Sequence, residues 1–277
     1  MNERATPRPT LLTSAMRVFD LSLGEMLWSR RTIFMALVVG LPVVISIIFR
    51  VLIEAGAPLR VNNAMATGPT VFGLMIWAFF IRFSIPVLGV FYGTALIADE
   101  VEDKTITYLF TRPISRGAVL LGKYFAYLAC TVLVVLPSVL IVWLLVVPVN
   151  GSLGLSFPDL LKDLGLLALG LAVYGAVFAF VGTAIRRPLL VGLLFVFGWE
   201  TGVMALPGYL KRFSVAYYLQ GLVPHAMPSD SAVSIVQAIF REVPTLADSL
   251  TSLAVITVVS LWLATSLVSN REYVLEQ

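Results

Sequence analysis

The chain has 277 residues, of which 59% are hydrophobic and 13% are charged, and its formal net charge at pH 7 is +3. Soluble globular domains carry about 25% charged residues, so this chain has too few polar side chains for a water-exposed surface and is predicted to lie among membrane lipids. The small net charge, with basic residues near the ends of apolar runs, excludes nucleic-acid binding as the main function.

Residues 1–32 are predicted to be a cytoplasmic leader that contains an amphipathic helix. Met16, Phe19 and Leu23 recur at helical spacing, while Arg17 takes another face. Such a helix lies in the membrane interface rather than crossing the bilayer. The alternative is a leader without regular structure. The apolar run that follows has no small-residue cleavage site, so it is not read as a signal peptide.

The remainder of the chain, residues 33–277, is predicted to be an all-α transmembrane domain of six helices. A bilayer core requires about 20 apolar residues per helix, and the apolar runs match this length, although the fifth is short and the second is long. The predicted spans are residues 33–53, 70–98, 124–147, 160–185, 189–206 and 250–269.

Basic residues set the predicted orientation. Lys and Arg gather before the first span, between the second and third, between the fourth and fifth at Arg186 and Arg187, and after the sixth. Short cytoplasmic loops are rich in these residues. Both termini are therefore predicted to be cytoplasmic.

The densest charge of the chain lies in residues 99–123, between the second and third spans. A short polar segment in so apolar a chain is predicted to be a docking surface. Proline disfavours helix for the residue before it, so a short helix followed by a turn at Pro113 is expected. The candidate docking residues are Glu100, Glu102, Asp103, Thr105, Arg112, Pro113, Ser115 and Arg116.

Two charged residues lie inside predicted spans. At 1.5 Å per residue, Arg82 is about 18 Å from the outer end of the second span and Glu200 about 16 Å from the inner end of the fifth. Charge at this depth is costly and commonly functional, and opposite charges at one depth can offset each other. The alternatives are a functional site, a structural ion pair, and an Arg82 that faces a polar crevice without a partner.

The outer segment, residues 207–249, is too long for a simple turn and is predicted to hold re-entrant or interfacial helices. A short helix is expected over residues 230–242, capped by Ser229 or Asp230. Two roles are open for this segment: a plug that gates release, and a cover that shields the bundle.

Enzyme signatures are missing from the sequence. It has no phosphate-binding Gly-rich loop with Lys and Ser or Thr, no metalloprotease helix motif, and one histidine, His225, among prolines of the outer segment. The single cysteine, Cys130, lies in an apolar run and is interpreted as a small core residue. No catalytic residue, metal site or cofactor is expected in this chain.

The loop between the second and third spans resembles the cytoplasmic loop in membrane subunits of ABC-2 type ABC transporters. In those subunits an acidic cluster and a Thr precede a Leu, a Pro, a Ser-Arg pair and a Gly-Lys pair. The matching residues here are Glu100, Glu102, Thr105, Leu109, Pro113, Ser115, Arg116, Gly122 and Lys123. Lys104 stands where members often have Gly. Within the family, the sequence is most similar to permeases of nitrous-oxide-reductase maturation and gliding-type systems.

The resemblance implies an ATP-driven exporter in the plasma membrane of a bacterium or archaeon, with an elbow helix and a cytoplasmic coupling helix. It implies a homodimer that works by alternating access, bound at its cytoplasmic loops to separate ABC ATPase subunits that hold the ATP and Mg. It places Arg82 and Glu200 beside the translocation route, because the second and fifth spans line that route in the family. An extracytoplasmic partner is a further expectation.

Two other classes of function remain open at this point. A secondary transporter or channel would usually show internal repeats with matching broken helices, and the sequence has no convincing duplication. A membrane scaffold without transport would give no reason for two charges at matched depth. The substrate, whether lipid, peptide, drug, polysaccharide precursor or sulfur species, cannot be read from the sequence.

Overall fold

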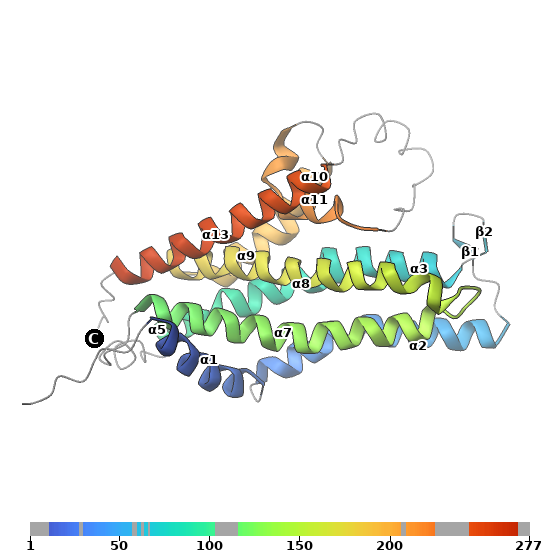
Figure 1. Cartoon of the computed structure of the whole chain (residues 1–277), viewed down its shortest axis with the longest axis horizontal. Helices are drawn as coiled ribbons and strands as arrows, with labels where there is room; N and C mark the ends of the chain where they lie inside the picture. The colour runs from blue at the N-terminus through green and yellow to red at the C-terminus, as the bar shows by residue number, and fades with distance from the viewer. Residues whose placement is uncertain are drawn as a thin grey trace, which may run out of the picture.

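The structure is a computed structural model that describes residues 11–27, 30–56, 60–61, 64–65, 67–102, 116–205, 209–224 and 244–270. These ranges are helical or turn-like apart from one small antiparallel ladder, in which β1 (Arg60–Val61) pairs with β2 (Ala64–Met65). The predicted all-α membrane fold is confirmed. Figure 1 shows a bundle of long helices with a group of shorter ones on one side.

Five stretches of helix in the described ranges are long and apolar enough to cross a membrane. These five are α2 (Arg30–Glu54), the segmented helix Gly68–Ala98, α7 (Arg116–Val146), α8 (Leu153–Ala184) and α13 (Leu246–Asn270). The region predicted as the fifth span is a shorter apolar helix, Pro188–Val203. A full crossing by this stretch stays a prediction.

The ends of the helices gather in two groups (Figure 1). The end of α5 (Ala95–Glu102), the start of α7, the turn from α8 to α9 (Pro188–Leu194) and the end of α13 lie at one end of the bundle. The strands and the α7–α8 turn lie at the other end. The helix ends that border the second-to-third loop, the α8–α9 turn with Arg186 and Arg187, and the end of α13 therefore lie at one end of the molecule.

The second membrane helix alternates between two helical geometries. It runs through α3 (Gly68–Met75), the π-helical η1 (Ile76–Ser84), α4 (Ile85–Leu88), the π-helical η2 (Gly89–Gly93) and α5. Pro86 sits just after η1, and because proline has no N–H it cannot complete the regular hydrogen-bond ladder. The sequence predicts a kink here, and the structure has widened turns on both sides of α4. Such π segments are rare and often mark functional sites.

The leader forms α1 (Leu11–Leu27), which packs on α7. Val18 and Ser22 are buried in this contact, and a Cβ on Gly122 of α7 would lie 2.8 Å from the Cβ of Val18. Met16, part of the predicted apolar stripe, is instead 62% exposed. The close approach at Gly122 fixes which face of α1 is covered, and it leaves Met16 on the outer surface.

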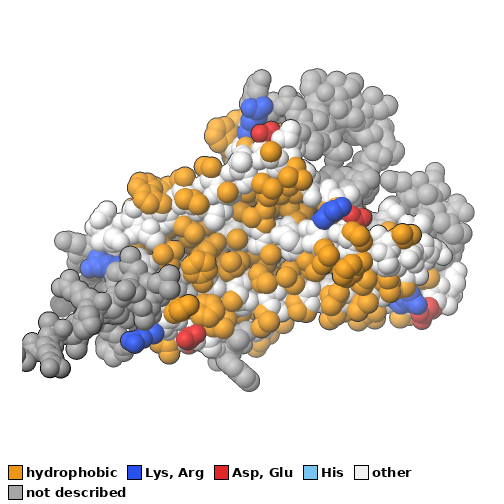
Figure 2. Space-filling view, in the orientation of Figure 1, with side chains coloured by type: hydrophobic (Ala, Val, Ile, Leu, Met, Phe, Trp, Pro, Cys, Tyr) orange, Lys and Arg blue, Asp and Glu red, His pale blue; other side chains and the backbone are white. Residues whose placement is uncertain are grey.

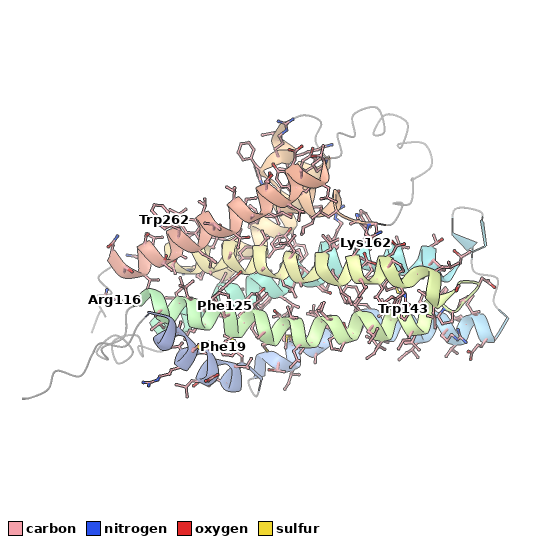
Figure 3. The ribbon with its side chains drawn as sticks, in the orientation of Figure 1. Phe19, Arg116, Phe125, Trp143, Lys162 and Trp262 are labelled. Carbon is pink, nitrogen blue, oxygen red and sulfur yellow. The ribbon has the colours of Figure 1, made fainter. Side chains whose placement is uncertain are left out.

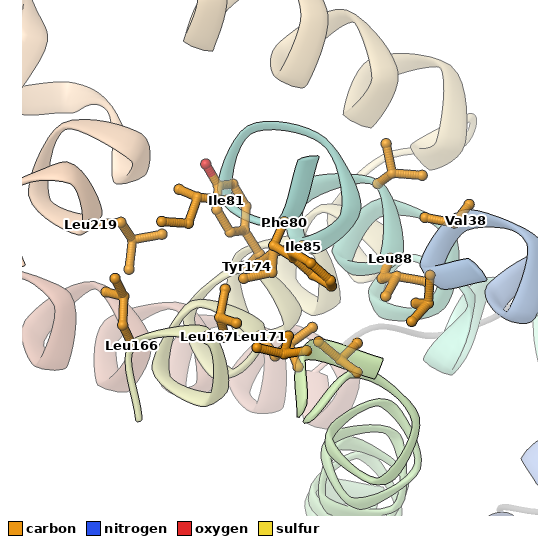
Figure 4. Close-up of a cluster of buried hydrophobic side chains, with 14 of the residues drawn as sticks. Val38, Phe80, Ile81, Ile85, Leu88, Leu166, Leu167, Leu171, Tyr174 and Leu219 are labelled. Carbon is orange, nitrogen blue, oxygen red and sulfur yellow. The ribbon is translucent and has the colours of Figure 1, made fainter. Parts of the chain in front are cut away.

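The core forms where small residues let helices approach closely. Tyr127 of α7 packs against Gly175 of α8, and its hydroxyl donates to the carbonyl of Leu171 at 3.0 Å. Tyr124 donates to the carbonyl of Ala172 at 2.9 Å. Figure 4 shows the adjoining cluster, in which residues of η1, α4 and α8 pack together. In a membrane such packing and interhelical hydrogen bonds replace the hydrophobic effect as the force that joins helices.

Apolar side chains also cover the outside of the bundle. Figure 2 shows hydrophobic residues along the visible face, with few charged ones between them. Trp262 of α13, labelled in Figure 3, is 65% exposed, and Leu194 of α9 is 72% exposed. A continuous exposed apolar surface is unstable in water and suits contact with lipid or with other membrane helices.

A matched pair of glycine substitutions in α8 tests the packing. A Cβ on Gly182 would lie 2.4 Å from the carbonyl oxygen of Thr94, whereas a Cβ on Gly165 would meet nothing within 4 Å. Overpacking costs about 1–3 kcal/mol, so Gly182→Ala should lower the midpoint of thermal unfolding of the full chain in detergent. Gly165→Ala should leave the midpoint unchanged or raise it. Equal midpoints for the two variants would contradict this packing.

Candidate functional site

Glu200 is a buried carboxylate held by donors from two parts of the chain, α8 and the start of the short helix that follows residue 214. It ends the π-helical η3 (Phe195–Glu200) and is only 5% exposed. Tyr174 of α8 donates its hydroxyl to Oε2 at 2.7 Å, and the Ser214 hydroxyl reaches the same oxygen at 3.3 Å. All of its contacts are donors, which is the arrangement that suits a carboxylate acceptor.

The start of a short helix supplies the other two donors. In α11 (Val215–Gln220), the backbone N–H of Val215 donates to Oε1 of Glu200 at 3.0 Å and that of Ala216 to Oε2 at 3.1 Å. N–H groups in the first turn of a helix have no partner within it, and they carry partial positive charge. Glu200 therefore satisfies the first turn of α11 from outside, while Ser214 caps it from within by accepting from the N–H of Tyr217 at 3.4 Å.

Arg82 is held differently. It lies in η1, 14 residues after Gly68 and 16 before Ala98 in the segmented helix, and is half-buried. Its Cζ lies 5.2 Å from the centroid of the Trp77 ring, a cation–π distance. The two residues are five apart, and because π-helical hydrogen bonds join residues i and i+5, the widened turn brings them onto one face.

The two charged residues line one small hollow but do not form an ion pair. Arg82 and Glu200 share this hollow with Tyr174 and other side chains, and it has about 10 Å³ open to the centre of a water molecule, room for about one water. Among the described residues, the ion pairs with nitrogen and oxygen within 4.0 Å do not include one between Arg82 and Glu200. The direct ion pair, one of the alternatives from the sequence, is therefore not formed, and the Glu200 oxygens accept hydrogen bonds from α8 and α11 instead.

The short helices beside this hollow lie partway along the bundle. Figure 1 places α10 (Thr201–Ala205) and α11 near the middle of its length, away from the end that carries the strands. The 3-10 helix η4 (Tyr209–Phe213) connects them to one another. The helix predicted over residues 230–242 lies outside the described residues.

The predicted docking residues are described only in part. The backbone of Glu100 and Glu102 is in α5, and Arg116 begins α7. Figure 3 shows Arg116 at the end of the bundle where α5 also ends. The predicted turn and the remaining candidates, Asp103, Thr105, Arg112, Pro113 and Ser115, lie outside the described residues.

Several residues of the site were not predicted from the sequence. Tyr174 stands next to the small residues Gly175 and Ala176 in the fourth predicted span, and Ser214 precedes an apolar stretch as a helix cap does. These two signals were available. Trp77 gave no signal, because its contact with Arg82 depends on a π-helical turn that a regular helical repeat does not reveal.

The apolar surface, the long helices and a charged hollow at mid-length define a multi-pass helical membrane protein. The chain belongs to the ABC-2 family of transporters, because its sequence matches the family described as ABC-2 family transporter protein over residues 18–271. It is thus a permease subunit of an ABC transporter, a transport component that is not itself catalytic. A comparison with curated proteins gives no match.

Removing the Glu200 carboxylate should release α11. In Glu200→Ala the buried N–H groups of Val215 and Ala216 lose their acceptor, and each unsatisfied donor costs about 1–3 kcal/mol. We expect faster hydrogen–deuterium exchange of peptides that cover residues 214–220 than in the wild type. Tyr174→Phe, which removes one donor and leaves the acceptor, should keep the protection of α11. Unchanged exchange in Glu200→Ala would reject the attachment.

The double mutant should not rescue the single ones. Since the carboxylate serves Tyr174 and α11 rather than Arg82, removal of Arg82 leaves those donors still without an acceptor. We therefore expect Arg82→Gln combined with Glu200→Ala to be no more stable to thermal unfolding than Glu200→Ala alone. An exchange of the two charges should not restore stability. Recovery of stability in either double variant would instead indicate a direct ion pair.

Proposed function

We propose that this permease is the membrane part of an ATP-driven exporter and works with separate ABC ATPase subunits. The single observation that carries the proposal is the family match over residues 18–271 in a sequence that has no phosphate-binding loop of its own. A chain of this kind needs a second protein to use ATP. The ATP and Mg would be bound by that ATPase partner and not by this chain.

The proposed assembly is a homodimer with two ATPase subunits, which operates by alternating access. One copy supplies six membrane helices if the Pro188–Val203 stretch crosses with the other five, and closed two-fold assemblies are the commonest form of homo-oligomer. The proposed location is the plasma membrane of a bacterium or archaeon, with both termini in the cytoplasm. The segment around α11 would face outward and could meet an extracytoplasmic partner.

The proposed coupling surface is the loop between the second and third membrane helices. Glu100 and Glu102 at the end of α5 and Arg116 at the start of α7 flank it. The sequence of this loop supports the proposal, because its acidic cluster, Pro113 and Ser-Arg pair resemble the ATPase-facing loop of the family. Asp103, Thr105 and Arg112 belong to the same proposed surface.

The proposed translocation route passes the hollow that Arg82 and Glu200 line. Charges within a membrane helix commonly mark substrate pathways, and π-helical segments often mark functional sites. Both features coincide here, since Arg82 lies in η1 and Glu200 in η3. The family match favours an ATP-driven permease over a secondary transporter or a scaffold. Neither of these two alternatives would need a loop that docks to an ATPase.

Neutralising the acidic part of the loop should uncouple ATP use from transport. In Glu100→Ala with Glu102→Ala, the complex with its ATPase should still hydrolyse ATP in proteoliposomes, but substrate transport per ATP should fall. The control removes two other acidic residues, Glu54 and Asp159, whose exposed ion pairs at 2.7 and 2.9 Å are each worth about 0–1 kcal/mol. Unchanged transport per ATP in the loop variant would reject the coupling role.

A further inference from the structure

We propose that Arg82 binds the acidic head group of an amphiphile, such as the phosphate of a lipid or lipid-like substrate, at the hollow beside α11. The inference rests on the proposed function for its role in transport. It adds the chemical class of the ligand, which neither the family match nor the sequence provides.

The first support is that Arg82 has donors without acceptors. Its guanidinium carries five N–H donors, and it lies over the face of the Trp77 ring, which offers no lone pair to them. Within the described part of the chain it has no hydrogen bond and no ion pair. Donors without acceptors at this depth favour an acceptor from outside the chain.

The second support is that the nearby carboxylate is already used. Both oxygens of Glu200 accept from α11, Ser214 and Tyr174. Part of its negative charge is also offset by the first turn of α11. The hydrogen bonds of Glu200 therefore hold α11 in place, and the guanidinium of Arg82 remains available to bind an anion other than Glu200.

The third support is the mixture of surfaces around the hollow. Besides the charged residues, it is lined by apolar groups such as Ile81, Pro86 and Val196. Figure 4 shows Tyr174 extending from α8 alongside Ile81. Beyond the lining, η3 continues into exposed apolar residues, including Phe197. An acidic head at Arg82 with a chain along this apolar surface matches the chemistry of an anionic amphiphile.

The size of the hollow determines where the head group binds. In this conformation there is room for about one water molecule, too little to enclose a phosphate. Arg82 is half-buried and lines the hollow, so the head group binds at the opening of the hollow, against the guanidinium. Arginine suits this role because its planar fork can bind two phosphate oxygens at once.

The test measures binding to the full chain in nanodiscs without any ATPase. One arm compares retention of phosphatidylglycerol with that of phosphatidylcholine of the same acyl chains, by native mass spectrometry. The other titrates dodecyl phosphate into phosphatidylcholine nanodiscs, with dodecyl maltoside as the neutral comparison. A charge-assisted contact is commonly worth about tenfold in affinity, so Arg82→Gln should weaken binding about tenfold in at least one arm.

Each outcome has a defined meaning. Loss of phosphatidylglycerol preference in Arg82→Gln identifies a bilayer lipid as the ligand, and loss of dodecyl phosphate binding alone identifies a free amphiphile. Arg187→Gln, which removes an exposed arginine at the α8–α9 turn, should preserve both. If neither arm depends on Arg82, or if Arg187→Gln has the same effect, the proposal is overturned.

A second measurement keeps the proposal testable if Arg82→Gln does not fold. Wild-type protein is labelled with a photoactivatable alkyl phosphate, and the labelled peptides are identified by mass spectrometry. Adducts in η1 or η3 support the site, and adducts confined to other helices overturn it. None of these assays needs ATP, so an absence of ATP-driven transport with intact binding would reject the proposed function alone.

Discussion

The buried carboxylate of Glu200 is the interaction on which the arrangement of the site depends. Removing a carboxylate from water costs several kcal/mol unless its oxygens are well supplied with hydrogen bonds. Here the supply comes from α8 through Tyr174, and from the start of α11 through two backbone N–H groups and Ser214. One residue of η3 thus holds α11 against α8, and the geometry of the hollow follows from that attachment.

Arg82 shows the consequence of this commitment. Both Glu200 oxygens already accept hydrogen bonds from α8 and α11, and the guanidinium of Arg82 lies instead over Trp77 at 5.2 Å. Cation–π contacts contribute about 0.5–2 kcal/mol, less than the cost commonly assigned to arginine at a membrane midplane, about 2.5–3.5 kcal/mol or more.

The sequence was sufficient for the outline of the fold and for the two charges, and it was insufficient for their partners. Apolar runs of spanning length are a strong signal, and all five long helices coincide with predicted spans. Depth along a helix is also countable, so Arg82 and Glu200 were found and do share one hollow. Whether the two side chains form an ion pair depends on how each helix is rotated about its axis and on which other donors reach Glu200. The hydrophobic periodicity of the sequence reveals neither.

Two local features explain the remaining differences. The π-helical turns of η1 and η3 change which residues share a face, so a repeat of 3.6 residues misses the contact between Trp77 and Arg82. The two N–H donors of α11 are main-chain groups, which every residue except proline has, so the sequence does not single them out. By contrast, Gly122 and Gly182 mark close helix contacts that a small-residue pattern can indicate but cannot assign to a partner.

The most direct test of this account is an experimental density map of the full permease in lipid, examined at Glu200. The account predicts that the carboxylate lies within hydrogen-bond distance of the backbone nitrogens of Val215 and Ala216 and of the Tyr174 hydroxyl, with the Arg82 guanidinium over Trp77. A map in which Glu200 turns to Arg82 as an ion pair, with α11 detached from it, would contradict the account.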